Sequence, residues 1–259
     1  MPKKNGTKAI DLNADVGEGC KNDALLMDYI SSANIACGAH AGDADTMALT
    51  IRIALKKRVA IGAHPGFADR QHFGRRTMSL SDDELIALVC EQLDTLQKFA
   101  TQEGGIVHHI KPHGALYTLT ATDSDVAKVF IDACQIVIPN ATIIGLAGSE
   151  LTTHAAHRAL PYLREGFIDR RYHSSSELVA RSSPGAIIEH PELVAKQSLQ
   201  LATALPITTA SGTNVCLLAD TLCLHGDHPA AFDNARAVVE KLQSNGLTIQ
   251  APHQSSTPI

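Results

Sequence analysis

Short apolar segments alternate along the chain with longer segments in which apolar residues recur every three or four positions. The short segments have the length of strands, and the long ones have the period of amphipathic helices. The predicted strands are 9–15, 33–38, 59–64, 106–111, 142–147, 163–169 and 221–225. The predicted helices are 23–30, 43–57, 81–103, 124–138, 149–160, 191–204 and 229–245. Seven strand-then-helix units predict an α/β protein with a parallel sheet, either doubly wound or closed into a barrel.

Local signals support these boundaries and a single domain. Ser81 and Glu84 form a capping-box pattern at the start of one helix, and Gly104 follows its end. No Pro-, Gly- or Ser-rich linker divides the chain, so we predict one domain over residues 1–259, with 1–8 flexible. Residues 170–189 and 207–219 break the alternation and are predicted to be loops or small hairpins, which in compact domains are often functional.

The first predicted strand carries a polar row in the sequence DLNADVGEG, residues 11–19. Side chains alternate along a strand, so Asp11, Asn13 and Asp15 share one face and the apolar residues between them share the other. A solvated edge strand explains such a row as well as the polar interior of a barrel does. The other strands are needed to decide.

Polar and ionisable residues also stand at the carboxyl ends of six of the seven predicted strands, where α/β proteins place their sites. They are Asn13, Asp15 and Glu18 for the first strand, Asn34 and His40 for the second, His64 for the third, Lys111 and His113 for the fourth, Asp169 and Arg170 for the sixth, and His225 and Asp227 for the seventh. A single histidine at a strand end is more often structural than functional. The recurrence at six ends favours one shared pocket.

Such a pocket has the groups for hydrolysis. Carboxylates beside histidines bind a metal that activates water, or act directly as base and acid. Lysine and arginine suit a carboxylate or phosphate on the substrate. The sequence has no HExxH, GxSxG or GxxxxGK[ST] motif and no GxGxxG after a strand, which removes common zinc-protease, serine-hydrolase and nucleotide-binding signatures. Attack of water on an amide-like bond is the simplest prediction.

Composition indicates which classes of partner and which cellular compartment to expect. The 259 residues carry a formal net charge of −5 at pH 7, which argues against a nucleic-acid surface. No stretch of 18 apolar residues and no signal-peptide pattern is present, so we expect a cytoplasmic protein without membrane contact. Six scattered cysteines without a CxxC pair argue against disulfides and exclude a cysteine-rich zinc site.

Eight sequence blocks together resemble one protein family. In chain order they are DLNADVGEG, SSANIACGAHAGD, AIGAHPGFADRQHFGRR, HIKPHGALY, GLAGSE, DRRY, ARSSPGAII and LCLHGD. They resemble the LamB/YcsF family, the A subunits of bacterial ATP-hydrolysing 5-oxoprolinases, from about residue 9 to residue 245. The resemblance implies a seven-stranded parallel β/α barrel of the glycoside hydrolase/deacetylase type. It also implies hydrolytic opening of 5-oxo-L-proline, a cyclic amide, to L-glutamate, with ATP hydrolysed to ADP and phosphate.

The resemblance implies partners as well. In the family, B and C subunits phosphorylate the lactam oxygen, and the A subunit opens the activated ring. ATP is then expected to be bound by the partner subunits, which agrees with the missing phosphate-binding loop. The sequence leaves open whether ATP also touches this chain and whether the chain forms a homodimer.

The pocket motifs of the family can be placed residue by residue on this sequence, with Asp11 at the start of the first block. The catalytic residues implied in this way are Asp15, His40, His64, Lys111 and His225. The implied substrate-binding residues are Asn13, Glu18, Asn34, His113, Asp169, Arg170, Arg181 and Asp227.

Roles follow from charge and position. Asp15 is expected to be the general base for the attacking water, oriented by Asn13. Lys111 and Arg181 would hold the substrate carboxylate or phosphate. One of the three catalytic histidines would protonate the leaving ring nitrogen.

The sequence leaves a divalent metal open. Asp15, His40 and His64 could form the Asp-His-His set of related deacetylase barrels, but a metal-free acid/base site is also compatible with the sequence. Two other functions also remain: a standalone metal-dependent deacetylase or amidohydrolase acting on a carbohydrate-derived amide, and a non-enzymatic regulatory or binding subunit. Turnover of 5-oxoproline that requires ATP and partners would exclude the first, and loss of function on pocket substitution would exclude the second.

Overall fold

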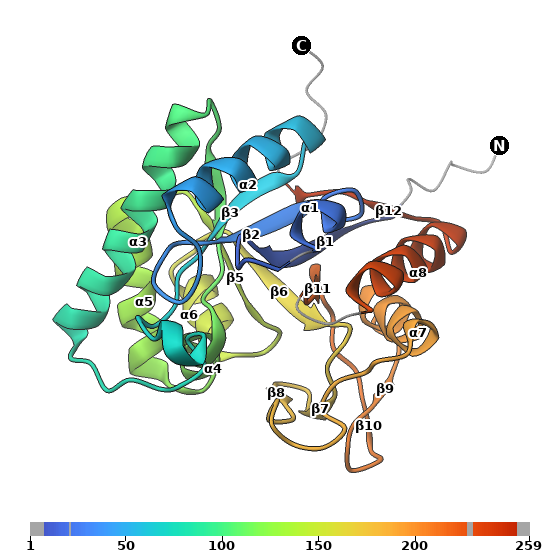
Figure 1. Ribbon diagram of the computed structural model, residues 1–259. Coiled ribbons are helices and arrows are strands. Elements are labelled where there is room, and N and C mark those ends of the chain that lie inside the picture. The colour runs from blue at the N-terminus through green and yellow to red at the C-terminus, as the bar shows by residue number, and fades with distance from the viewer. Residues whose placement is uncertain (1–7, 21, 227–229, 253–259) are drawn as a thin grey trace.

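A computed structural model describes residues 8–20, 22–226 and 230–252, and the centre of this part is a closed ring of seven parallel strands (Figure 1). The strands are β1 (Lys8–Val16), β2 (Ser32–Ala36), β3 (Ala60–His64), β4 (Val107–Ile110), β5 (Thr142–Leu146), β6 (Tyr162–Phe167) and β11 (Thr221–Leu224). They pair in this order, and β11 pairs back to β1 with Asp11 opposite Thr221. The predicted barrel is confirmed. The doubly wound and edge-strand alternatives are excluded, because β1 has a partner on both sides.

Each barrel strand is followed by at least one helix, and the helices surround the ring (Figure 1). They are α1 (Asp23–Leu26), α2 (Ala44–Lys57), the 3-10 helix η1 (Arg70–His72), α3 (Asp82–Gln102), α4 (Gly114–Thr122), α5 (Ser124–Val137), α6 (Glu150–His157), α7 (Pro191–Ala202) and α8 (Ala231–Ser244). The capping box of Ser81 and Glu84 is present at the start of α3. The helix predicted over 23–30 is only one turn long, and α4 was not predicted.

Three smaller features complete the chain. The hairpins β7 (Tyr172–Ser174)–β8 (Glu177–Leu178) and β9 (Ile207–Thr208)–β10 (Asn214–Val215) fall within the two segments that break the alternation, and they form a lobe beside the barrel (Figure 1). The unpredicted strand β12 (Leu247–Ile249) pairs with the first residues of β1. Of the predicted flexible segment 1–8, residues 1–7 lie outside the described residues, and Lys8 begins β1, which corrects that boundary.

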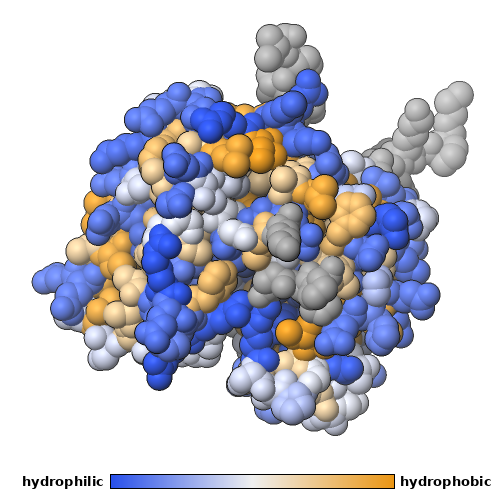
Figure 2. Space-filling view, in the orientation of Figure 1, coloured by the Kyte–Doolittle hydropathy of each residue, from blue (hydrophilic) through white to orange (hydrophobic). Residues whose placement is uncertain are grey.

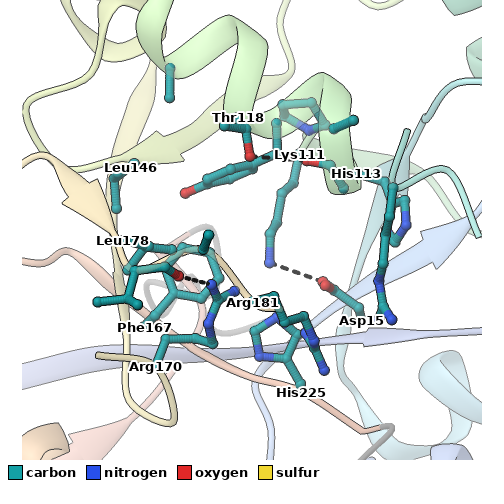
Figure 3. A pocket seen from close by; sticks show the side chains of 18 of the residues that line it. Asp15, Lys111, His113, Thr118, Leu146, Phe167, Arg170, Leu178, Arg181 and His225 are labelled. Carbon is teal, nitrogen blue, oxygen red and sulfur yellow. Dashed lines mark hydrogen bonds and ion pairs between the residues drawn. The ribbon is translucent and has the colours of Figure 1, made fainter. Parts of the chain in front are cut away.

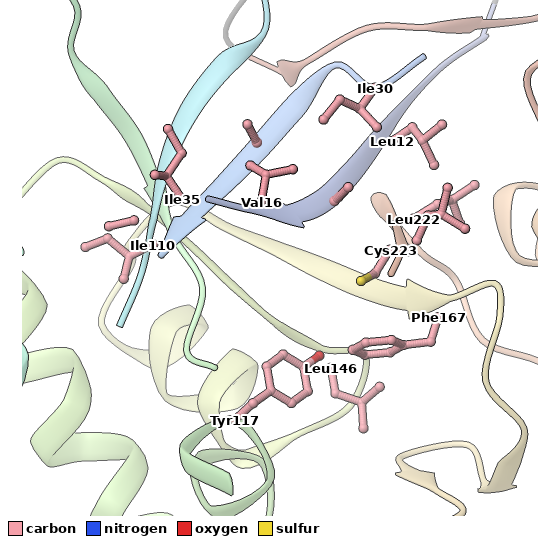
Figure 4. Packing of buried hydrophobic residues seen from close by; sticks show 14 of the residues in the cluster. Leu12, Val16, Ile30, Ile35, Ile110, Tyr117, Leu146, Phe167, Leu222 and Cys223 are labelled. Atoms are coloured by element: carbon pink, nitrogen blue, oxygen red, sulfur yellow. The ribbon is translucent and has the colours of Figure 1, made fainter. Parts of the chain in front are cut away.

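The apolar core lies between the barrel and its helices. Leu12, Val16, Ile35 and Leu222 point outward from the strands and are fully buried (Figure 4). Replacing one such residue with alanine costs roughly 2–5 kcal/mol, so this shell holds the fold together. The inward faces are different. Many inward positions carry polar side chains in place of the branched apolar layers that usually fill such a barrel.

The face seen in Figure 2 is mostly hydrophilic, with apolar residues in separate patches and a notch between the barrel and the hairpin lobe. No helix in the described part of the chain has the length and apolar character to cross a membrane. No disulfide joins the cysteines within the described ranges.

Candidate active site

A cavity of about 790 Å³ opens at the carboxyl ends of the barrel strands (Figure 3). Its volume falls within the range of small-molecule sites. Its wall combines polar groups from the strand ends with residues of α4 and of the β7–β8 region. The ionisable members of the wall include Asp15, Glu18, His64, Arg75, Lys111, His113, Tyr117, Arg170, Arg181 and His225.

Asp15 stands near the end of β1 with its carboxylate in the cavity wall (Figure 3). Oδ1 accepts hydrogen bonds from Lys111 Nζ and Asn34 Nδ2, both at 2.9 Å, and Oδ2 lies 3.3 Å from His64 Nε2. Burial alone would raise the pKa of Asp15, but His64 and Lys111 outweigh it and hold the pKa well below its ordinary value. Asp15 is therefore ionised at neutral pH, as a general base must be.

Lys111 follows β4 and supplies the balancing charge from inside the barrel. Its residue surface is only 1% exposed, and Nζ lies 2.9 Å from both Asp15 Oδ1 and Glu165 Oε1 and 3.1 Å from Cys223 Sγ. Burial lowers the pKa of Lys111, but Asp15 and the other partners raise it well above its ordinary value. Its ammonium group is engaged by two carboxylates and so helps to position Asp15, and its predicted grip on the substrate stays a prediction.

A chain of amide and hydroxyl groups fills the barrel beneath the cavity. Asn34 Nδ2 donates to Asn13 Oδ1 at 2.8 Å, and Asn34 Oδ1 lies 2.9 Å from His109 Nε2. Asn13 Nδ2 donates to Glu165 Oε1 at 3.0 Å and to Thr221 Oγ1 at 2.7 Å. Asn13 and Asn34 are fully buried and do not line the cavity. In this position they support Asp15 from below, and their predicted contact with substrate stays a prediction.

Asp11 closes this network at the bottom of the barrel. It accepts hydrogen bonds from the hydroxyls of Ser31, Ser32 and Thr221 at 2.5–2.7 Å. Burial raises its pKa in spite of these donors. The polar row of β1 thus runs from a structural carboxyl at Asp11 to a cavity carboxylate at Asp15.

Glu18 and three histidines form a second group at one side of the cavity. The His40 and His113 rings are stacked with centroids 3.7 Å apart, and Glu18 Oε1 lies 3.4 Å from a nitrogen of each. Burial lowers the pKa of His40 to about 3 and that of His113 to about 2, so both rings are neutral at pH 7. Burial, assisted by Asp15, raises the pKa of Glu18 to about 7.

Two sets of described residues bring metal-ligating atoms together. Glu18, His40, His64 and His113 place one ligand atom each within 4.8 Å of all the others. The second set is Asp15, Cys223 and His225, in which Lys111 already binds the first two. Neither set is the predicted trio of Asp15, His40 and His64.

His225 and two arginines form another part of the cavity wall (Figure 3). The Asp169 carboxylate accepts hydrogen bonds from the backbone N–H and from Nδ1 of His225, both at 2.9 Å. This fixes the ring and turns its other nitrogen away from Asp169. Arg170 donates to the carbonyl of Val179 at 2.7 Å, and Arg181 follows on the same segment. The pKa of Arg170 is lowered by burial and by Arg181.

The cavity gathers most of the predicted residues. Asp15, Glu18, His64, Lys111, His113, Arg170, Arg181 and His225 line it. His40 and Asp169 are buried behind the wall, where Asp169 positions His225. Their predicted roles toward the substrate stay predictions. Asp227 lies outside the described residues.

Sequence reasoning missed three residues of this site. Glu165 is fully buried and joins Lys111 to Asn13. The sequence feature that could have indicated Glu165 is a charged residue inside an otherwise strand-like segment. Arg75 and Tyr117 line the cavity and lie within the sequence blocks that resemble the family. They were missed because Arg75 lies in a loop and Tyr117 in a helix, and not at strand ends.

Comparison with known proteins places the chain in a family. The model of the LamB/YcsF family matches residues 10–257. The chain belongs to the LamB/YcsF family. A curated relative, the A subunit of 5-oxoprolinase from Erwinia tasmaniensis, is 44% identical over 242 residues, which cover 93% of this chain and 99% of the relative.

Solved structures agree with this membership. The lactam utilization protein from Thermus thermophilus is 37% identical, with a TM-score of 0.86 over 94% of this chain and 99% of that one. A family 4 carbohydrate esterase from Streptomyces lividans has a TM-score of 0.50 at 9% identity, covering 95% of each chain. The second likeness shows the fold alone: LamB/YcsF proteins share their barrel with deacetylase-type enzymes.

Proposed function

We propose that this chain is the A subunit of an ATP-dependent 5-oxoprolinase, and that its cavity opens the ring of 5-oxo-L-proline to give L-glutamate. The identity of 44% to a 5-oxoprolinase A subunit over nearly the full length of both chains supports the assignment. The observation that carries it in the structure is an ionised carboxylate, Asp15, held in the wall of a small-molecule cavity by Lys111 and Asn34. Hydrolysis of an amide needs such a base for the attacking water.

The walls of the cavity supply the other roles. Arg170 and Arg181 carry the cationic groups that suit the substrate carboxylate or an added phosphate. His225, held by Asp169, turns its second ring nitrogen away from that carboxylate and would donate the proton to the leaving ring nitrogen. His40 is buried behind the wall and is a weaker candidate for that step.

In this proposal the energy of ATP enters through the partners. The B and C subunits phosphorylate the lactam oxygen, and this chain then directs water to the activated ring carbon. The C–N bond breaks, the ring nitrogen leaves with a proton, and a second water releases phosphate from the resulting acyl phosphate. The missing phosphate-binding loop is consistent with ATP binding by the partners. The complex converts 5-oxo-L-proline, ATP and water into L-glutamate, ADP and phosphate.

The test is a coupled assay of glutamate release by the chain alone and with B and C subunits. We expect turnover only with ATP and both partners. Release of glutamate without ATP, or release of acetate from an N-acetylated sugar by the chain alone, would contradict the proposal and favour the deacetylase alternative.

Asp15→Asn is the decisive variant within that assay. The amide keeps the shape and the hydrogen bond from Lys111 but cannot accept a proton, so turnover should fall by at least about 10²-fold, in the range of a lost general base. Circular dichroism and the thermal midpoint check that the fold is retained. Turnover at the wild-type rate would show that Asp15 is not the base.

A further inference from the structure

Four buried side chains converge on one point beside Asp15, each from a different loop or strand end. Glu18 follows β1, His40 follows β2, His64 ends β3, and His113 precedes α4. Glu18 Oε1 is 3.4 Å from His40 Nε2, 3.4 Å from His113 Nδ1 and 3.9 Å from His64 Nε2. His64 Nε2 is 3.0 Å from His113 Nδ1. These side chains are at most 7% exposed.

The hydrogen bonds on the far sides of two rings fix where their lone pairs point. His64 Nδ1 lies 2.8 Å from the carbonyl of Lys111, and His113 Nε2 lies 2.8 Å from the carbonyl of Phe73. A carbonyl only accepts, so each of these nitrogens carries the ring proton. In neutral imidazoles the opposite nitrogens then present lone pairs, and these face each other at 3.0 Å. Two lone pairs at this distance repel unless a cation lies between them.

A single proton does not satisfy the whole group. It would join His64 to His113 but would leave the other two residues unchanged. Three buried atoms have no hydrogen-bond partner among the described residues: Nδ1 and Nε2 of His40, and Oε1 of Glu18. A buried polar atom without a partner costs about 1–3 kcal/mol. A ligand bound by several of these atoms at once would remove that cost.

The spacing and chemistry of the donors identify that occupant. A tetrahedral zinc ion with bonds of about 2.0–2.1 Å holds its ligand atoms about 3.3–3.4 Å apart, and the four separations above lie on either side of that value. Imidazole nitrogen with one carboxylate oxygen is a donor set for zinc and similar divalent transition metals. We infer that Glu18, His40, His64 and His113 bind one divalent transition-metal ion, preferentially zinc. Glu18 and His113 take the place that the sequence prediction gave to Asp15.

The surroundings of the rings support a site built before binding. Backbone carbonyls orient His64 and His113, as outer-shell partners do in metal sites. Gly74 has φ of +63°, and a Cβ there would come within 2.8 Å of His40 Cβ, so this backbone approach needs glycine. The ion would adjoin Asp15, whose Oδ2 is 3.3 Å from His64 Nε2. A bound divalent ion lowers the pKa of water, which is the chemistry it would offer to a hydrolase.

Metal content tests the inference without any activity measurement, so its outcome is separate from that of the proposed function. The full chain without a His tag is loaded with ZnCl₂, dialysed and analysed by plasma mass spectrometry. We expect about one zinc ion per wild-type chain, because four protein ligands bind zinc tightly. His40→Gln and His113→Gln should retain less than a tenth of that amount. The control His157→Ala removes an exposed histidine of α6 and should retain all of it.

Two further measurements locate the ion and guard against misfolded variants. The competing set of Asp15, Cys223 and His225 is tested by His225→Gln, which should keep the zinc if the inference is right. The thermal midpoint of the wild type should fall on chelation, whereas that of a folded His40→Gln variant should not change. Absence of bound zinc in the loaded wild type, wild-type zinc content in His40→Gln, or an anomalous-scattering peak at Cys223 would each overturn the inference.

Discussion

At the scale of single residues, the site depends on a buried lysine between two carboxylates. Lys111 contacts Asp15 and Glu165 at 2.9 Å each, and neither carboxylate has much access to water. A buried charge is tolerable only while its partner is present, so the three residues form one electrostatic unit. Asn13 and Asn34, the neutral residues beneath the cavity, position the two carboxylates through hydrogen bonds.

Replacing this lysine should therefore destabilise the whole protein. Lys111→Met keeps the length of the side chain but leaves Asp15 and Glu165 buried without a cation, at a cost of about 3–5 kcal/mol. The free energy of unfolding in urea measures the loss. Adding Glu165→Gln removes one of the uncompensated charges, so the double variant should be more stable than Lys111→Met alone. A double variant with the summed loss of both single variants would contradict this coupling.

Asp169 gives a prediction for the pH dependence of stability. Burial alone would raise its pKa, but the hydrogen bonds and charge of His225 lower the pKa below the ordinary 3.8. A lowered carboxyl pKa stabilises the folded state above pH 3.8 and loses that contribution as the pH falls through the folded-state pKa. The stability gap between wild type and Asp169→Asn should be widest above about pH 5 and shrink below pH 3.8.

Denaturant unfolding at a series of pH values measures that gap. Asp94→Asn, on the exposed face of α3, is the matched control and should leave a small gap that does not depend on pH. A gap for Asp169→Asn that grows on acidification would show that the ion pair with His225 does not stabilise the fold.

Some residues of the site can be predicted from the sequence and others cannot. Asp15, His64 and His225 stand at or next to strand ends, and the period of two along a strand predicts which way they face. Glu165 lies in mid-strand and was missed, because an isolated glutamate at that position also suits a solvent-facing side chain. Its role depends on Lys111 and Asn13, which lie 54 and 152 positions away in the chain. Sequence periodicity does not report such pairings.

At the scale of elements, the strands were predictable because their apolar runs are short, buried and bounded by polar residues. All seven predicted barrel strands overlap the observed ones. Helix α4 was missed because GALYTLTAT has no polar face: it is packed beside the cavity and mixes apolar residues with threonines all round. Strand β12 was missed because three residues carry too little pattern, and it exists through pairing with β1.

One position in β3 shows how an element supports the site. Gly62 has room for no side chain, because a Cβ there would lie 1.9 Å from His109 Nε2. The space beside Gly62 is thus filled by the His109 ring, which in turn contacts Asn34. Gly62→Ala should displace His109 and destabilise the fold by about 1–3 kcal/mol, as overpacked cores do.

A double-mutant cycle with His109→Ala isolates this contact. The alanine at position 62 then meets the space that the imidazole vacates, so the double variant should lose less stability than the sum of the two single losses. Urea unfolding of the four proteins gives the coupling energy. Strict additivity would mean that Gly62 is required for another reason.

At the scale of the whole molecule, closure of the barrel was the feature that the pattern left undecided. A doubly wound sheet and a barrel share the same alternation of strands and helices. The difference is whether the last barrel strand returns to the first, and the pairing of β11 with β1 settles it. That pairing also places Thr221 beside Asn13 and so completes the network of polar side chains beneath the cavity. Closure of the barrel and assembly of the site therefore depend on the same strand pairing.

This architecture predicts an uneven distribution of stability. Amides of β1 and β11 lie inside a closed ladder and open only with much of the barrel, whereas much of the segment 174–185 is exposed at the rim. Hydrogen exchange measured by mass spectrometry should be slowest in the first group and fastest in the second. Saturating L-glutamate should slow exchange at 177–182, which lines the cavity, and leave the β9–β10 hairpin unchanged. Equal slowing of both hairpins would mean that the ligand acts on the lobe as a whole and not through the cavity wall.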